Sequence, residues 1–193
     1  PEAGQVLGER IASIARYAGG THFINKRVAN NRRVRLLHEA LPAARFVTTV
    51  RDGRAVALSL SKVDWWPGST VWWAGVTPSE WQAQGRDPWE LCAENWVREV
   101  EVIEGGLTSV PQDLQHSTSY EELISDPVGV LARIASEIGL EADPAWLEEV
   151  SAIRLPNKNE RWRAELAGPP MRVMDAVQGP TLRRLGYLDG EAS

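Results

Sequence analysis

The residues from Ala44 to Leu60 constrain the fold of this chain more than any other stretch. Their first part, 45–50, is rich in β-branched and aromatic residues and predicts a buried strand. The chain then turns at Arg51-Asp52-Gly53-Arg54 and continues as an Ala/Leu/Val segment typical of a helix, with Asp52 as a suitable N-cap. A strand, a charged turn and a helix N-terminus in succession predict an anion-binding site in an α/β protein.

Two side chains of this segment suit a phosphate group. Arg51 can donate paired N–H groups to phosphate oxygens, and Ser59, two turns into the helix, can add a hydroxyl. We therefore predict that Arg51 and Ser59 bind a nucleotide phosphate. The alternative is an arginine in a surface ion pair and a serine without a binding role, and the residues alone favour neither interpretation.

The distribution of charge supports a small anionic ligand. The 193-residue chain has a net charge of −5, which argues against a general nucleic-acid or anionic-membrane binder. From Lys26 to Arg54, however, there are eight basic and two acidic residues, so this window carries +6 and the remaining residues carry −11. A basic centre in an acidic chain fits a small anion better than a long polyanion.

Length and composition predict a single globular domain over residues 1–193. Cys92 is the single cysteine, which excludes an internal disulfide, and the three histidines are too widely spaced to suggest a metal site. No apolar run approaches the roughly 20 residues needed to span a bilayer. We expect a cytoplasmic protein without a membrane span or a bound metal, and the sequence does not indicate its oligomeric state.

The other elements alternate between helices and strands. Hydrophobic spacing predicts strands over 21–26 and 114–119 and helices over 5–17, 31–41, 88–103, 127–138, 144–153, 171–177 and 181–185. Gly105-Gly106 is expected to close the helix at 88–103. Strand, helix, strand and helix from residue 21 onward form a βαβα order, which predicts a parallel sheet flanked by helices.

The stretch from Val63 to Asp87 departs from this alternation. It contains five tryptophans among prolines and glycines, and its hydrophobic periodicity is poor. We therefore predict a long Trp-rich excursion from the core.

Three motifs follow one another in the order Phe46–Ser59, Tyr120–Pro127 and Leu182–Tyr187. In this order and approximate spacing they resemble sulfotransferases that use 3′-phosphoadenosine 5′-phosphosulfate (PAPS), and the resemblance extends from about Phe23 to Tyr187. The residues of these motifs are most similar to those of bacterial members and of the tyrosylprotein sulfotransferase branch. The resemblance implies a P-loop-NTPase-like α/β fold and an enzyme that moves a sulfuryl group from PAPS to a hydroxyl or amine, leaving adenosine 3′,5′-bisphosphate.

The resemblance also implies roles for single residues. Arg51 and Ser59 match the pair that grips the 3′-phosphate, and Tyr120 matches a tyrosine that contacts the nucleotide near the adenine. Lys26 resembles the lysine beside the transferred group, where an ammonium stabilises the charge of the transition state. The loop 157–163 resembles the C-terminal loop that folds over the nucleotide, with three candidate contacts, Lys158, Asn159 and Arg161.

Each of these roles has a structural alternative. Tyr120 also suits a half-buried core position, Lys26 a solvated surface, and 157–163 a solvated charged loop. The indoles of the Trp-rich segment suit the cover of a small-molecule, glycan or lipid acceptor, and for any single indole packing onto the body is the better interpretation.

The sequence departs from the family pattern at two points. The strand and Gly/Ser/Thr-rich loop that hold the 5′-phosphosulfate are not found before Gln5, and we expect this segment and the general base in residues that precede Pro1. The histidine that some branches place two residues after the lysine is Val28 here. These departures favour, as an alternative, a non-catalytic nucleotide-binding or interaction domain of the same fold. A P-loop kinase relative would need a Gly-x-x-x-x-Gly-Lys-Ser/Thr motif, which the sequence lacks.

Overall fold

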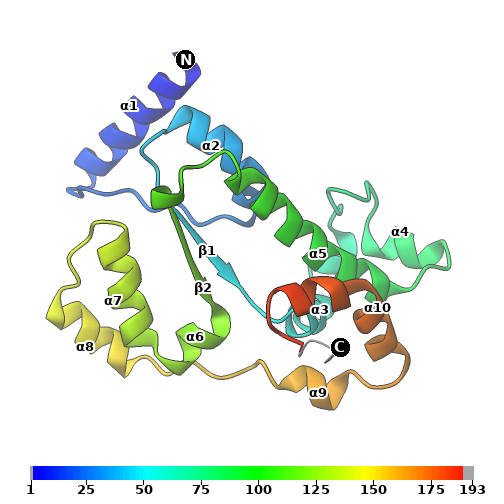
Figure 1. Cartoon of the computed structure of the whole chain (residues 1–193). Coiled ribbons are helices and arrows are strands. Elements are labelled where there is room, and N and C mark those ends of the chain that lie inside the picture. The colour runs from blue at the N-terminus through cyan, green and yellow to red at the C-terminus, as the bar shows by residue number, and fades with distance from the viewer. Residues whose placement is uncertain (1, 189–193) are drawn as a thin grey trace.

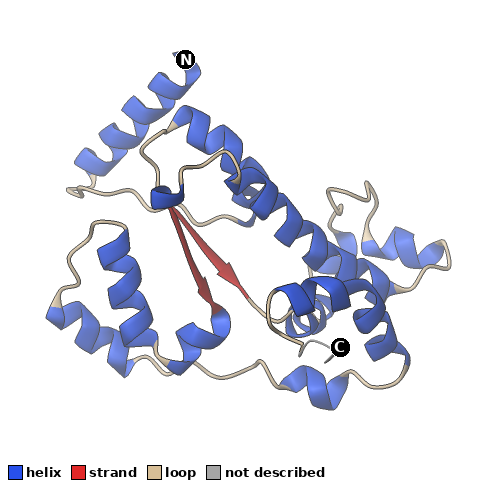
Figure 2. Cartoon of the chain, viewed as in Figure 1, coloured by secondary structure: helices blue, strands red, loops and turns tan. Residues whose placement is uncertain are grey.

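The computed structural model describes residues 2–188. Over this range the chain is mainly helical, with one small parallel sheet near the middle of the molecule (Figures 1 and 2). A mixed α/β class is therefore confirmed, although the sheet has two strands where the βαβα order implied more. None of the described helices is long and apolar enough to cross a bilayer.

The elements follow one another as helices interrupted by the two strands. The α-helices are α1 (Glu2–Tyr17), α2 (Val34–Ala40), α3 (Gly53–Ser61), α4 (Pro78–Ala83), α5 (Pro88–Leu107), α6 (Tyr120–Ser125), α7 (Pro127–Glu137), α8 (Pro144–Ala152), α9 (Arg161–Glu165) and α10 (Pro169–Arg184). The 3-10 helices are η1 (Val28–Arg33), η2 (Trp66–Gly68) and η3 (Gln112–Leu114), and the strands are β1 (Phe46–Val50) and β2 (Gln115–Ser119).

The two strands pair in parallel, and this pairing places the functional motifs. The register runs from Phe46 opposite Gln115 to Val50 opposite Ser119. The strands predicted at 45–50 and 114–119 are thus confirmed, within a residue at their starts. Because both strands point the same way, the turn that opens α3 and the N-terminus of α6 lie at the same end of the sheet (Figure 1).

Local side chains fix both helix starts at this end of the sheet. Asp52 caps α3 as predicted, since its Oδ1 accepts a hydrogen bond from the Arg54 backbone N–H at 2.9 Å. At α6, the Ser119 hydroxyl accepts from the Glu122 N–H at 3.0 Å, and Glu122 Oε2 accepts from the Ser119 N–H at 2.9 Å. The second of these bonds, to the Ser119 backbone, lowers the pKa of the Glu122 carboxyl.

The core lies where α3, α5 and α10 pack together (Figure 1). Its central side chains are almost fully buried: Ala57, Leu91, Cys92, Ala93, Met174 and Leu182. Gly53 permits the closest approach, because a Cβ there would lie 2.6 Å from the Trp96 ring and 2.9 Å from Gln178 Oε1. The first turn of α3 is therefore held tightly against α5 and α10.

The Trp-rich segment contributes to the same core. Trp66 in η2 and Trp81 in α4 are buried in the main hydrophobic cluster, whereas Trp65 and Trp72 are exposed. Trp73 packs edge-on against Trp81, with 6.0 Å between the ring centroids. The buried indoles thus act as packing residues, and a role for the exposed ones over an acceptor stays a prediction.

Three predictions of local structure are wrong. Residues 21–26 are irregular rather than a strand. Their side chains are exposed, and no described strand pairs with them. Helix α5 continues through Gly105-Gly106, because the missing side chain of Gly106 lets Val34 pack directly on the helix. The pieces predicted at 171–177 and 181–185 form one helix, α10, with Pro180 inside it. Burial of Met174 and Leu182 on either side offsets the hydrogen bond that Pro180 cannot donate.

Candidate anion-binding site

Arg51, the first residue after β1, contacts the loop before α9 and the first residue of α6. Its Nε donates to Asn159 Oδ1 at 3.0 Å and its Nη2 donates to the Lys158 carbonyl at 3.0 Å. The guanidinium carbon lies 4.2 Å from the centroid of the Tyr120 ring. Tyr120 in turn donates its hydroxyl to the Pro156 carbonyl at 3.3 Å. The structure therefore brings together four residues predicted to contact a nucleotide, namely Arg51, Tyr120, Lys158 and Asn159.

A pocket of about 250 Å³ opens beside Arg51. It is formed by the end of β1, one face of α3, and the loop before α9, and its lining residues are Arg51, Ala55, Leu58, Ser59, Lys62, Val63, Lys158 and Arg161. Four of these side chains are cationic, and the described residues of the lining include no acid. We call this cavity the Arg51 pocket. A hydroxyl and several cations around one small space suit a phosphate.

The cations of the Arg51 pocket differ in how they are paired. Lys62 forms an ion pair with Glu165 of α9, and Arg161 reaches the other oxygen of that carboxylate at 3.1 Å. The bond from Lys62 lowers the pKa of the Glu165 carboxyl. Within residues 2–188, by contrast, neither Arg51 nor Lys158 forms an ion pair with a carboxylate. Their charges are therefore available to an anionic ligand.

A buried ion pair supports the turn beneath Arg51. Arg54 donates from Nε and Nη2 to the two oxygens of Asp52, at 3.0 and 2.8 Å, and both side chains are nearly buried, at 6% and 5% exposed. Arg54 also donates to the Tyr187 carbonyl at 3.0 Å, and its guanidinium carbon lies 3.9 Å from the centroid of the Trp162 ring. The turn is thus tied to α9 and to the residues after α10, and Arg54 faces the core rather than a ligand.

Glu121 is the residue of this region that the sequence analysis missed. Its Oε1 accepts from the Asp52 backbone N–H at 3.1 Å and from Asn159 Nδ2 at 2.7 Å, while its Oε2 accepts from the Tyr187 hydroxyl at 2.9 Å. Burial, with a further contribution from Glu121, raises the pKa of the Tyr187 phenol, which therefore stays a donor. The sequence offered one indication of a role for Glu121, namely its position directly after Tyr120. Its three hydrogen-bond partners are all distant in the sequence.

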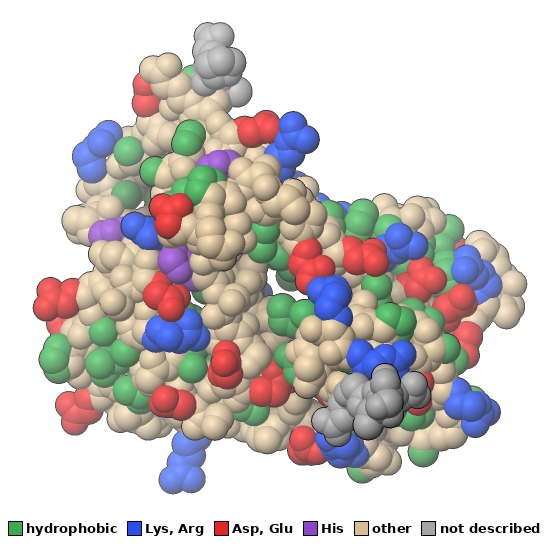
Figure 3. Space-filling view, in the orientation of Figure 1, with side chains coloured by type: hydrophobic (Ala, Val, Ile, Leu, Met, Phe, Trp, Pro, Cys, Tyr) green, Lys and Arg blue, Asp and Glu red, His purple; other side chains and the backbone are tan. Residues whose placement is uncertain are grey.

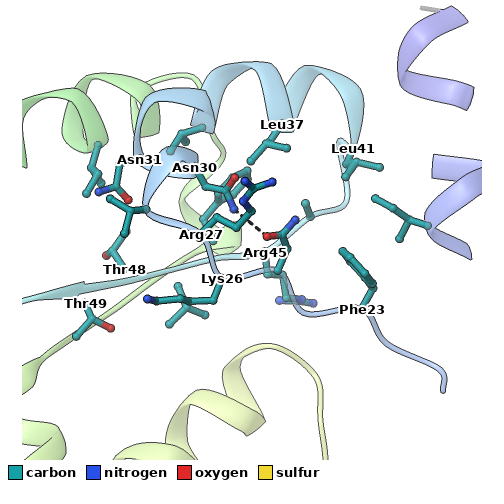
Figure 4. Close-up of a pocket in the computed structure, with 18 of the residues that line it drawn as sticks. Phe23, Lys26, Arg27, Asn30, Asn31, Leu37, Leu41, Arg45, Thr48 and Thr49 are labelled. Atoms are coloured by element: carbon teal, nitrogen blue, oxygen red, sulfur yellow. Dashed lines mark hydrogen bonds between the residues drawn. The ribbon is translucent and has the colours of Figure 1, made fainter. Parts of the chain in front are cut away.

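Lys26 lies apart from the Arg51 pocket, in a second cavity of about 480 Å³ between η1, α2 and β1 (Figure 4). We call this cavity the Lys26 pocket. In Figure 4 the lysine side chain points along β1 toward Thr49, which precedes Arg51 by two residues, or about 7 Å of strand. The opposite end of the cavity is apolar, with Phe23 and Leu41 on its wall. The structure thus places the two pockets along the same strand without merging them.

Charges on the wider surface are mixed. On the face shown in Figure 3, basic and acidic side chains lie interspersed over most of the elements. The charge on this face is thus mixed, whereas the Arg51 pocket is lined by cations, which agrees with a small anionic ligand.

Comparison with known proteins assigns the chain to a family. A solved structure described as the sulfotransferase domain from the curacin biosynthetic pathway resembles this chain with a TM-score of 0.59 at 13% identity, over 92% of this chain and 67% of that one. At this identity the likeness concerns the fold. No curated protein matches the chain. The sequence model described as "Sulfotransferase family" matches residues 1–144. The chain belongs to the sulfotransferase family.

Proposed function

We propose that this protein transfers a sulfuryl group from PAPS to a hydroxyl or amine of an acceptor. Membership of the sulfotransferase family supports sulfuryl transfer in general. The observation that carries the PAPS assignment is the Arg51 pocket, in which Arg51, Ser59 and Lys158 surround one small cavity whose described lining includes no acid. PAPS differs from common adenine nucleotides in its 3′-phosphate, and this pocket has the chemistry to hold such a group.

In this proposal each side chain has a defined role toward the donor. The contacts to Asn159 and Lys158 fix the Arg51 guanidinium, and its Nη1 NH₂ group, which has no hydrogen-bond partner within residues 2–188, donates to the 3′-phosphate. The Ser59 hydroxyl donates a further hydrogen bond, and Arg161 adds positive charge at the rim. Tyr120, whose ring is covered by Arg51 on one side, borders the adenine.

PAPS supplies an activated sulfuryl group, whose transfer leaves negative charge on the departing phosphate. We propose that the Lys26 ammonium stabilises that charge, because its side chain points along β1 toward the end of the strand where Arg51 lies. A general base must also take the proton of the acceptor. The protein needs no metal for these steps, since lysine and arginine supply the positive charge.

The Lys26 pocket is the proposed acceptor side. It combines a cationic and amide-lined end, with Lys26 and Asn30, and an apolar end formed by Phe23, Leu37 and Leu41. An acceptor with a polar reacting group and an apolar part fits such a cavity, whether it is a small molecule, a glycan with an aglycone, or a lipid.

The test is transfer of labelled sulfate by the full-length protein. The protein is incubated with PAPS carrying labelled sulfate and with a cell extract, and labelled products are identified by mass. We expect a labelled product together with an equal amount of adenosine 3′,5′-bisphosphate. Absence of label from every fraction, with PAPS left intact, would contradict sulfuryl transfer from this donor.

A further inference from the structure

The Glu121 carboxylate joins three segments of the chain, one of which contains Arg51. It comes from the first turn of α6, and it accepts from the turn after β1, from the loop before α9, and from the residues after α10. Its contact with Asn159 is the shortest of the three, at 2.7 Å. Glu121 itself does not line the Arg51 pocket. Glu121 therefore makes no direct contact with a ligand in that pocket, and its hydrogen bonds act through its partners.

Asn159 is the partner that also touches Arg51. Its amide has a donating end and an accepting end, and the two ends are used differently: Nδ2 donates to Glu121, while Oδ1 accepts from Arg51 Nε at 3.0 Å. With the amide reversed, an NH₂ group would face the guanidinium, and two donors would meet. Asn159 is 8% exposed, so solvent cannot readily replace either bond.

We propose that Glu121 is a positioning residue for the arginine of the 3′-phosphate site. Its carboxylate selects the orientation of the Asn159 amide, and the amide oxygen then holds Arg51 with its free Nη1 amine toward the pocket. The hydrogen bond that the Asp52 N–H donates to Glu121 fixes the backbone directly after Arg51 in the same way. This inference rests on the proposed function, because it assigns a role within the donor site.

The proposal makes hydrogen-bond geometry, rather than negative charge, the required property. A glutamine at this position keeps a carbonyl oxygen for Asp52 and Asn159, and its NH₂ group can donate to the Tyr187 hydroxyl, which accepts equally well. An alanine removes all three bonds. Glu121→Gln should therefore preserve what Glu121→Ala loses.

The experiment compares the affinities of two nucleotides for the full-length protein by calorimetry. Adenosine 3′,5′-bisphosphate reports on the 3′-phosphate site, and AMP, which lacks that phosphate, reports on the rest of the nucleotide. We expect Glu121→Ala to weaken bisphosphate binding by about tenfold, the equivalent of one charge-assisted hydrogen bond, and to leave AMP binding unchanged. Glu121→Gln should bind both as the wild type does. Glu122→Ala is the matched control, since it removes a capping bond from the same helix turn without touching Asn159.

A double-mutant cycle tests the route through Asn159. Asn159→Ala should weaken bisphosphate binding as Glu121→Ala does, and the double variant should be no weaker than the more affected single variant. Additive losses, or an equal loss for AMP, would overturn the positioning role. If Glu121→Ala does not fold, Asn159→Ala still decides, because unchanged bisphosphate affinity in that variant overturns the proposal. A wild-type protein that does not bind the bisphosphate would instead overturn the proposed donor.

Discussion

The Arg51 guanidinium lies against the ring of Tyr120, with 4.2 Å between the guanidinium carbon and the ring centroid. The parallel register explains this contact. Val50 is paired with Ser119, so the next residue of each strand emerges at the same end of the sheet. Two motifs that are distant in the sequence thus meet because β1 and β2 run in the same direction.

Lys26 should affect the chemical step and not donor binding. It lines the Lys26 pocket and not the Arg51 pocket, so Lys26→Met should leave the affinity for adenosine 3′,5′-bisphosphate unchanged. The loss of one positive charge at the transferred group should lower kcat by about 100-fold. Steady-state kinetics and calorimetry measure the two effects, and Arg10→Met, on the exposed side of α1, is the control. A variant with full kcat would remove Lys26 from the catalytic machinery.

Arg54→Met should destabilise the protein strongly. The substitution leaves the Asp52 carboxylate buried without its charged partner and removes the stacking on Trp162. We expect the free energy of unfolding to fall by about 3–5 kcal/mol, measured by urea denaturation. Arg35→Met, which breaks an ion pair whose side chains are 76% and 57% exposed, should leave it almost unchanged, because solvent screens that pair. Similar small losses in both variants would show that the buried pair does not support the turn.

Gly53→Ala should destabilise the folded protein, because the added methyl group overpacks the core. Its new Cβ would lie 2.6 Å from the Trp96 ring, so side chains of α5 or α10 must shift, at a cost of about 1–3 kcal/mol. Gly105→Ala is the matched control, because that glycine is also helical and its Cβ would meet nothing within 4 Å. At position 105 the better helix propensity of alanine should raise the free energy of unfolding by up to about 1 kcal/mol. Equal effects of the two substitutions on thermal unfolding would contradict the close packing at Gly53.

The local elements around the site could be predicted because their determinants are neighbours in the sequence. The β-branched run of β1, the Asp52 cap and the Asp126-Pro127 start of α7 are all present in a few adjacent residues. Residues 21–26 had a similar composition but are irregular, because a strand exists only where another strand pairs with it. The continuity of α10 through Pro180 likewise depends on burial against α5, which the local sequence does not show.

The site could be predicted in part for the same reason. Arg51 and Ser59 were predicted from the strand, turn and helix that carry them, and Lys158, Asn159 and Arg161 from the resemblance of their loop to the family. The structure brings all of them to one region. Whether they bind a nucleotide stays a proposal. Glu121 was missed because its role comes from three partners on other segments.

Alkaline pH should destabilise the fold through Cys92. Burial raises the pKa of this thiol from 9.0 to about 11, while the thiol of the unfolded chain ionises near 9. The unfolded state therefore loses a proton between pH 9 and 11 that the folded state retains, and stability should fall as pH rises through that window, by roughly 3 kcal/mol. Urea denaturation at pH 8, 9, 10 and 11 measures the slope. Cys92→Ala, which lacks the ionisable group, should show a shallower slope, and an identical slope would contradict the buried neutral thiol.

The most direct test of the central claim is the thermal stability of the full-length protein with adenosine 3′,5′-bisphosphate, compared between the wild type and Arg51→Ala. Binding to the native state raises the melting temperature by mass action. We expect the bisphosphate to raise it for the wild type far more than AMP does. Arg51→Ala should lose most of the shift, since a charge-assisted bond is worth about 1.5–3 kcal/mol. Arg45→Ala, which changes the arginine at the other end of the same strand, should retain the shift. An equal shift for Arg51→Ala and the wild type, or no shift with the bisphosphate at all, would contradict a 3′-phosphate site at Arg51.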